Sequence, residues 1–134
     1  MEVVRKINDE LAIAGIVTVQ QFYQIAEEGF RSVLNLRSLD RGSLAEEKRS
    51  VERLGLCYVN LPIDTEVMSP EVAGKVLKQI GKLPKPSLVC CNNAMLAAAV
   101  VLMYIAIGQG EPLQKAFKRA EDLGLFASLQ AAAF

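Results

Sequence analysis

The chain has 134 residues, of which 51% are hydrophobic and 22% are charged, and its 15 basic and 15 acidic side chains cancel to a formal net charge of zero. This composition excludes a disordered or fibrous protein and predicts a single globular domain over residues 1–134. Zero net charge argues against a nucleic-acid partner, and it favours self-association, so a homodimer is possible.

The apolar runs and the cysteines indicate the cellular compartment of the protein. The first residues lack the apolar core of a signal peptide, and the longest apolar run, residues 94–107, is too short to cross a membrane. Three cysteines, two of them adjacent, do not form a secreted disulfide pattern, and a chain without histidine or a C-x-x-C pair is not suited to zinc. We therefore expect a cytoplasmic protein that has no membrane partner, no metal and no cofactor.

Apolar strand patterns alternate with capped helical patterns along the sequence. In chain order they predict a strand at residues 11–17, a helix at 19–28, a strand at 32–36, a helix at 43–54, a strand at 57–63, a helix at 69–80, a buried strand at 87–90, and helices at 93–107 and 112–123. Strands that alternate with crossover helices form parallel sheets, so we predict an α/β fold with three layers (αβα). Its central, mainly parallel sheet would have four or five strands, and sites in such sheets lie beyond the carboxyl ends of strands.

Residues 87–97 carry the strongest chemical signal, because an apolar strand ends there in a cysteine and a helix begins within two or three residues. A cysteine at a helix N-terminus lies near unpaired backbone N–H groups and the positive end of the helix dipole, which favour a thiolate and can hold an anion. Cys91 is therefore the candidate nucleophile, although a small buried packing residue is the alternative interpretation. Cys90 and Cys57 are predicted to be packing residues.

Four segments in this order and spacing carry a resemblance to a known family. They are Ile7-Asn8-Asp9-Glu10, taken as an opening strand that leads to Gly15, and residues 28–37 (EGFRSVLNLR), 54–62 (LGLCYVNLP) and 116–124 (AFKRAEDLG). Together with the cysteine loop they resemble the bacterial phosphatase-like branch of the protein tyrosine and dual-specificity phosphatase superfamily. The resemblance implies a protein tyrosine phosphatase-like fold and a cysteine-based phosphate loop.

The resemblance also shows which part of that loop is missing. The family has a histidine before the cysteine and an arginine five or six positions after it, whereas here Cys90 precedes Cys91 and either Leu96 or Ala97 replaces the arginine. Ala94 stands where many relatives have a glycine. The family's arginine grips the phosphate and stabilises the transition state, and loss of one oxyanion donor already costs roughly 3 to 4 kcal/mol. We therefore expect phosphatase activity to be weak or absent.

The resemblance assigns further site residues by position. With Cys91 as nucleophile, the phosphate loop would comprise Asn92, Asn93, Ala94, Met95 and Leu96. Asp64, which follows the third predicted strand, is the candidate general acid, with Asp40 as the lesser candidate. Arg37, at the end of the second strand, is the candidate substitute for the missing cation. The simpler interpretations are turn residues for both aspartates, a surface charge for Arg37 and a helix cap for the asparagines.

These residues leave three functions open. The first is a catalytically impaired, pseudophosphatase-like protein that binds a phosphate-containing small molecule or a phosphoprotein. The second is a weakly active cysteine-dependent phosphatase that works through a Cys91 phosphoenzyme, with Arg37 replacing the clamp. The third is a rhodanese-like sulfur or redox protein that uses Cys91. Turnover of an aryl phosphate and of thiosulfate would separate them.

Overall fold

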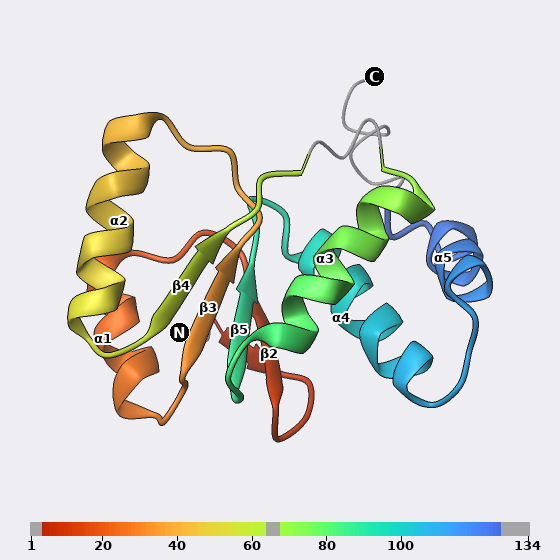
Figure 1. Ribbon diagram of the computed structural model, residues 1–134, viewed down its shortest axis with the longest axis horizontal. Helices are drawn as coiled ribbons and strands as arrows, with labels where there is room; N and C mark the ends of the chain where they lie inside the picture. Colours follow the sequence, from red (N-terminus) through yellow and green to blue (C-terminus); the bar gives the residue numbers. More distant parts are fainter. Residues whose placement is uncertain (1–3, 64–67, 127–134) are drawn as a thin grey trace.

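The computed structural model describes residues 4–63 and 68–126 of the chain. Five strands and five helices occur in these ranges (Figure 1). Their order is β1 (Val4–Lys6), β2 (Leu11–Ala14), α1 (Val19–Glu27), β3 (Ser32–Asn35), α2 (Arg41–Arg53), β4 (Cys57–Asn60), α3 (Pro70–Lys82), β5 (Ser87–Cys90), α4 (Ala94–Gly108) and α5 (Leu113–Asp122). The predicted alternation of strands and helices is confirmed.

A single five-stranded sheet has the strand order β1-β2-β5-β3-β4. Strands β2, β5, β3 and β4 are parallel, and β1 is antiparallel to β2 at one edge. All four residues of the central strand β5 are buried, as expected for an apolar strand covered on both faces. The register pairs Asn35 of β3 with Cys90 on one side and Asn60 on the other, so three strands end together at one edge of the sheet.

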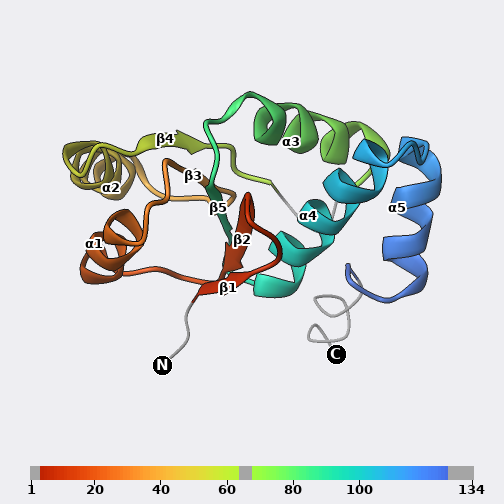
Figure 2. The same cartoon turned by 90° about the horizontal axis from the view of Figure 1, so that it is seen from below.

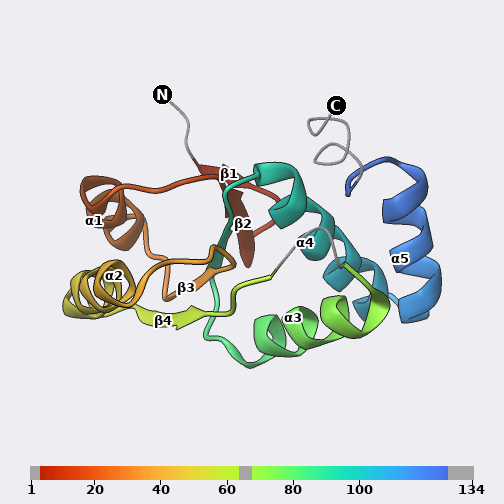
Figure 3. The ribbon, with the colours of Figure 1, turned by 90° about the horizontal axis from the view of Figure 1, so that it is seen from above.

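Helices cover both faces of the sheet, which gives the predicted three layers (Figure 2). Helices α1 and α2 pack on one face, and α3 and α4 pack on the other, with α5 against α3 and α4. Side chains alternate along β5, so Leu88 and Cys90 belong to the core under α1 and α2. Val89 and Cys91 belong to the core under α3 and α4. Figure 3 shows this layering from the edge where β3, β4 and β5 end.

Local sequence signals fix where the helices start and stop. Thr18 and Gln21 form a capping box at the start of α1, and Ser69 caps α3 immediately before Pro70. Gly29 and Gly55 follow α1 and α2 with φ of +96° and +85°, a conformation that favours glycine. These signals explain why the helix boundaries lie close to those predicted.

The structure corrects several predictions. The strands predicted at residues 11–17 and 57–63 end three residues earlier, as β2 at Ala14 and β4 at Asn60. Residues 7–10 do not form an opening strand, because Asn8 Oδ1 accepts the N–H groups of Glu10 and Leu11 at 2.8 Å each and closes a turn between β1 and β2. Helix α2 begins at Arg41, two residues earlier than predicted, because Asp40 caps it. Cys57 is exposed and is not a packing residue, since it begins the edge strand β4.

Candidate functional site

The junction between β5 and α4 places Cys91 at the carboxyl end of the central strand. Cys91, Asn92 and Asn93 alone separate the two elements, and we call these three residues the junction loop. The Cys91 N–H donates to the carbonyl of Ala14 in the neighbouring strand at 3.2 Å. Gly15 lies against the same residue, because a Cβ on this glycine would be 3.8 Å from the Cys91 carbonyl oxygen. The cysteine is therefore held where β2 and β5 end.

The two adjacent cysteines have different surroundings on opposite faces of the sheet. Cys91 is 5% exposed and belongs to the same apolar core as Leu96 and Val100. Cys90 is 2% exposed on the other face, and burial, followed by the nearby negative charge of Glu47, raises the pKa of its thiol to about 12. Cys90 therefore stays protonated at neutral pH and is a packing residue.

The N-terminus of α4 is capped from within the chain. Asn93 Oδ1 accepts the Met95 N–H at 2.8 Å, and the Asn93 carbonyl accepts the Leu96 N–H at 3.0 Å. These amides belong to the first helical turn, where the N–H groups that bind anions at helix N-termini are found. An anion at the junction loop must therefore use other donors or displace the Asn93 side chain from Met95.

The two positions at which the family's arginine would fall, 96 and 97, lie in the core. Leu96 and Ala97 are both 0% exposed and pack in the core under α3 and α4. Met95, one residue earlier on the same helical turn, is 41% exposed. Side chains at positions 96 and 97 therefore extend into the protein interior.

Arg37, two residues after the end of β3, brings a positive charge to the junction loop. Its Nε donates to Asn92 Oδ1 at 2.8 Å, and the side chain is half-buried. Its backbone N–H donates to Asn35 Oδ1 at 2.9 Å, and its carbonyl accepts from Asn60 Nδ2 at 2.8 Å. Neither ion pair within residues 4–63 and 68–126 involves Arg37. The guanidinium charge is therefore available to a ligand at the loop.

A buried polar network next to Arg37 was not found by sequence reasoning. Asn35 Nδ2 donates to Glu47 Oε2 at 2.6 Å and to the Tyr58 hydroxyl at 3.0 Å, and that hydroxyl donates to Glu47 Oε2. Burial, followed by the hydrogen bond to Glu47, raises the pKa of Tyr58 above its usual range. An asparagine within the apolar strand Ser32–Asn35 is the signal that could have revealed the network, because buried amides need partners.

Of the two candidate acids, only Asp40 belongs to the described residues. Asp64 lies outside the described residues. Asp40 caps α2: its carboxylate accepts the Ser43 N–H at 2.8 Å and the Ser43 hydroxyl at 2.9 Å, and these bonds lower its pKa. Within the described ranges, no cluster of acidic residues and cysteines is arranged to hold a metal ion. No helix in those ranges is long and apolar enough to cross a membrane.

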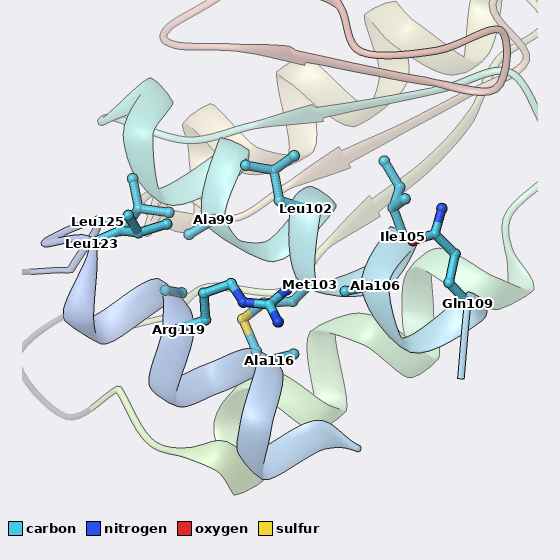
Figure 4. Close-up of a pocket in the computed structure, with 11 residues that line it drawn as sticks. Ala99, Leu102, Met103, Ile105, Ala106, Gln109, Ala116, Arg119, Leu123 and Leu125 are labelled. Carbon is cyan, nitrogen blue, oxygen red and sulfur yellow. The ribbon is translucent and has the colours of Figure 1, made fainter. Parts of the chain in front are cut away.

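A concave region lies away from the junction loop. It is an apolar groove of about 250 Å³ between α4 and α5 (Figure 4). Its lining residues are Ala99, Leu102, Met103, Ile105, Ala106, Gln109, Ala116, Arg119, Ala120, Leu123 and Leu125. None of them belongs to the junction loop or to the strand ends beside it, so the groove is separate from the Cys91 site.

Solved structures identify the fold. No protein-family model matches the chain, and no curated protein matches its sequence. A candidate phosphatase from Neisseria meningitidis is similar at a TM-score of 0.70 and 21% identity, over 92% of this chain and 90% of that chain. A candidate DUF442 phosphatase from Shewanella putrefaciens is similar at a TM-score of 0.72 and 22% identity, over 96% of this chain and 85% of that chain. P. aeruginosa TpbA, in a complex with phosphotyrosine, is similar at a TM-score of 0.68 and 14% identity, over 92% of this chain and 74% of that chain.

These similarities cover nearly the whole chain at low sequence identity, so they show the fold alone. The activity has to be inferred from the residues of the site. The chain has the α/β fold of protein tyrosine phosphatase-like proteins, as its sequence predicted.

Proposed function

We propose that this protein is a catalytically impaired member of the phosphatase fold that binds a phosphate-containing small molecule or a phosphorylated protein at the junction loop. One observation carries the proposal: the guanidinium at the loop comes from Arg37, two residues after β3, while Leu96 and Ala97, at the two positions where the family's arginine would fall, are packed in the core. The cation is thus present at the loop but reaches it from a different element.

The donors around the loop suit an oxyanion. Among the described residues, the Arg37 guanidinium donates from Nε to Asn92, which leaves its two terminal nitrogens as a planar pair for phosphate oxygens. Asn92 is exposed, and the N-terminus of α4 adds the positive end of a helix dipole. TpbA in its complex with phosphotyrosine supports a phosphorylated ligand for this fold.

The same geometry argues against efficient hydrolysis. A cysteine phosphatase needs a thiolate that the substrate can reach and a clamp that fits the transition state better than the bound phosphate. Cys91 is 5% exposed, and the Arg37 Nε already donates to Asn92. One absent oxyanion donor lowers the rate about 100- to 1,000-fold. We therefore infer binding with turnover near background.

Weak protein tyrosine or dual-specificity phosphatase activity is the second candidate function, because Cys91 follows the central strand and precedes a helix N-terminus. Its Sγ would attack phosphorus and form an S–P bond while the P–O bond to the alcohol breaks. The leaving oxygen would take a proton from an acid, for which Asp64 is the candidate. A redox function as a thiol pair has less support, since Cys90 and Cys91 belong to cores on opposite faces of the sheet. Sulfur transfer, which needs the Cys91 thiol alone, stays a prediction that thiosulfate turnover tests.

The proposal includes a cytoplasmic location, because all three cysteines are free. We propose no nucleic-acid or membrane partner, and self-association into a homodimer stays a prediction from the zero net charge.

Thermal melting with inorganic phosphate tests the binding. At ten times the dissociation constant, a ligand stabilises by about 1.4 kcal/mol, or roughly 5 °C in Tm for a chain of this length. We expect that shift in the wild type and its loss in Arg37→Ala. Phosphate also stabilises proteins generally, so Arg49→Ala, an exposed residue of α2, serves as the control that retains the shift. Equal shifts in both variants would contradict the role of Arg37.

Turnover of an aryl phosphate tests the impairment. We expect a rate near background that does not change in Cys91→Ser. Robust turnover that disappears in Cys91→Ser would establish the second candidate function in place of the first.

A further inference from the structure

We propose that Asn35, held by Tyr58 and Glu47, is the positioning residue that directs the Arg37 guanidinium to the junction loop. The inference rests on the proposed function, because it names the residues that make Arg37 the anion-binding group. It assigns a role to a buried network that no step of the binding or of the chemistry otherwise uses.

Both polar atoms of the Asn35 side chain, the amide nitrogen and the amide oxygen, make hydrogen bonds that fix it in place. It is 1% exposed, and its amide nitrogen uses both hydrogens, one to Glu47 Oε2 at 2.6 Å and one to the Tyr58 hydroxyl at 3.0 Å. Its amide oxygen accepts the backbone N–H of Arg37 at 2.9 Å. The side chain therefore has one orientation, and that orientation locates the backbone of Arg37.

The strands on either side complete the placement of Arg37. On the β5 side, the Leu36 N–H donates to the Cys90 carbonyl at 2.8 Å. On the β4 side, Asn60 Nδ2 donates to the carbonyls of Asn35 at 2.9 Å and Arg37 at 2.8 Å. The arginine thus leaves the sheet at a fixed point, from which its Nε reaches Asn92 Oδ1 at 2.8 Å. A long side chain with a fixed origin loses less conformational entropy when it binds a ligand.

The chemistry of the network explains why an asparagine stands at position 35. Only an amide can donate two hydrogen bonds to Glu47 and Tyr58 and accept one from Arg37 at the same time. An aspartate there would place a second carboxylate against Glu47 and lose both donors. A phenylalanine at position 58 would remove the hydroxyl that accepts from Asn35 and donates to Glu47.

The test observes the Arg37 side chain directly, so it distinguishes the positioning of Arg37 from a contribution of the network to the stability of the fold. The Nε–H resonance of Arg37 in ¹H–¹⁵N spectra, assigned by its loss in Arg37→Ala, reports the hydrogen bond to Asn92 without any ligand. We expect Tyr58→Phe to shift this resonance and speed its exchange with solvent, and to weaken phosphate binding at least fivefold in melting experiments. Ser32→Ala is the matched control, since Ser32 lies at the other end of β3 and its buried hydroxyl bonds to Ser87 at 2.7 Å. It should leave both readouts unchanged.

A second pair of variants covers the case in which Tyr58→Phe does not fold. Glu47 is half-buried on α2, so Glu47→Gln and Glu47→Ala should both be tolerated. We expect Glu47→Gln, which keeps an acceptor, to retain the wild-type Nε–H resonance, and Glu47→Ala to lose it. A wild-type resonance in both Tyr58→Phe and Glu47→Ala would overturn the inference. If phosphate did not raise the Tm of the wild-type protein, the proposed function would be refuted. The Nε–H resonance of Arg37 would still decide whether Asn35 positions this arginine.

Discussion

Replacing Leu96 with arginine tests why this site differs from a phosphatase loop. If the chain lacked only the family's cation, Leu96→Arg would restore phosphate binding or turnover. The structure predicts another outcome, because the Leu96 side chain is 0% exposed and packs in the core under α3 and α4. Arginine at this position would enter an apolar interior and would not reach the junction loop.

The expected loss of stability follows from the burial of Leu96. Removing a fully buried leucine side chain costs about 2 to 5 kcal/mol. Burying a guanidinium without a partner adds several kcal/mol unless the side chain escapes to the surface. We take a loss of about 4 kcal/mol as the lower bound. For a chain of 134 residues this corresponds to a fall in Tm of roughly 15 °C, because the unfolding entropy is about 2.1 cal/mol/K per residue.

Circular dichroism melting with and without phosphate, beside aryl-phosphate turnover, measures the outcome. Met95→Arg is the matched control, since Met95 is 41% exposed on the same helical turn and its substitution should cost less than about 0.5 kcal/mol. If Leu96→Arg melts like the wild type and gains turnover or phosphate-dependent stabilisation, position 96 reaches the loop and the reasoning is wrong.

Two further predictions concern the cysteines and pH. In the native protein only Cys57 should react rapidly with a thiol reagent, and Cys90 and Cys91 should react after denaturation; a second rapid thiol that persists in Cys57→Ser would contradict this. The raised pKa of Tyr58 gives the folded state stability that is fully present below the unfolded pKa near 10 and is lost as pH rises toward the folded pKa. Tyr58→Phe should therefore lose less stability between pH 9 and pH 11 than the wild type, and equal losses in denaturant titrations would refute that link.

The fold could be predicted because its signals are local and repeated. Strand β5 was predicted with the bounds that the structure gives, since Ser87–Cys90 is an apolar run between a turn and a helix cap. Strand β1 was missed because it has three residues at an edge and exposes Arg5 and Lys6, so it carries no alternating pattern. The antiparallel edge strand therefore has no sequence signal of its own.

The site could be predicted only where one local pattern defines it. The position of Cys91 follows from a strand end before a helix. The direction of Leu96 depends on where α4 begins, because each helical residue turns the next side chain by about 100°. The network around Asn35 joins α2, β3 and β4, and sequence gives no distance between Glu47 and Tyr58. Such contacts between distant segments need the tertiary structure.

A crystal structure with bound phosphate tests the central claim most directly. Wild-type protein and Arg37→Ala would be crystallised at the same phosphate concentration. We predict a phosphate within hydrogen-bond distance of the terminal nitrogens of Arg37, beside Asn92 and the N-terminus of α4, in the wild type alone. An identical phosphate in Arg37→Ala, or a wild-type loop without an anion at saturating phosphate, would contradict the account.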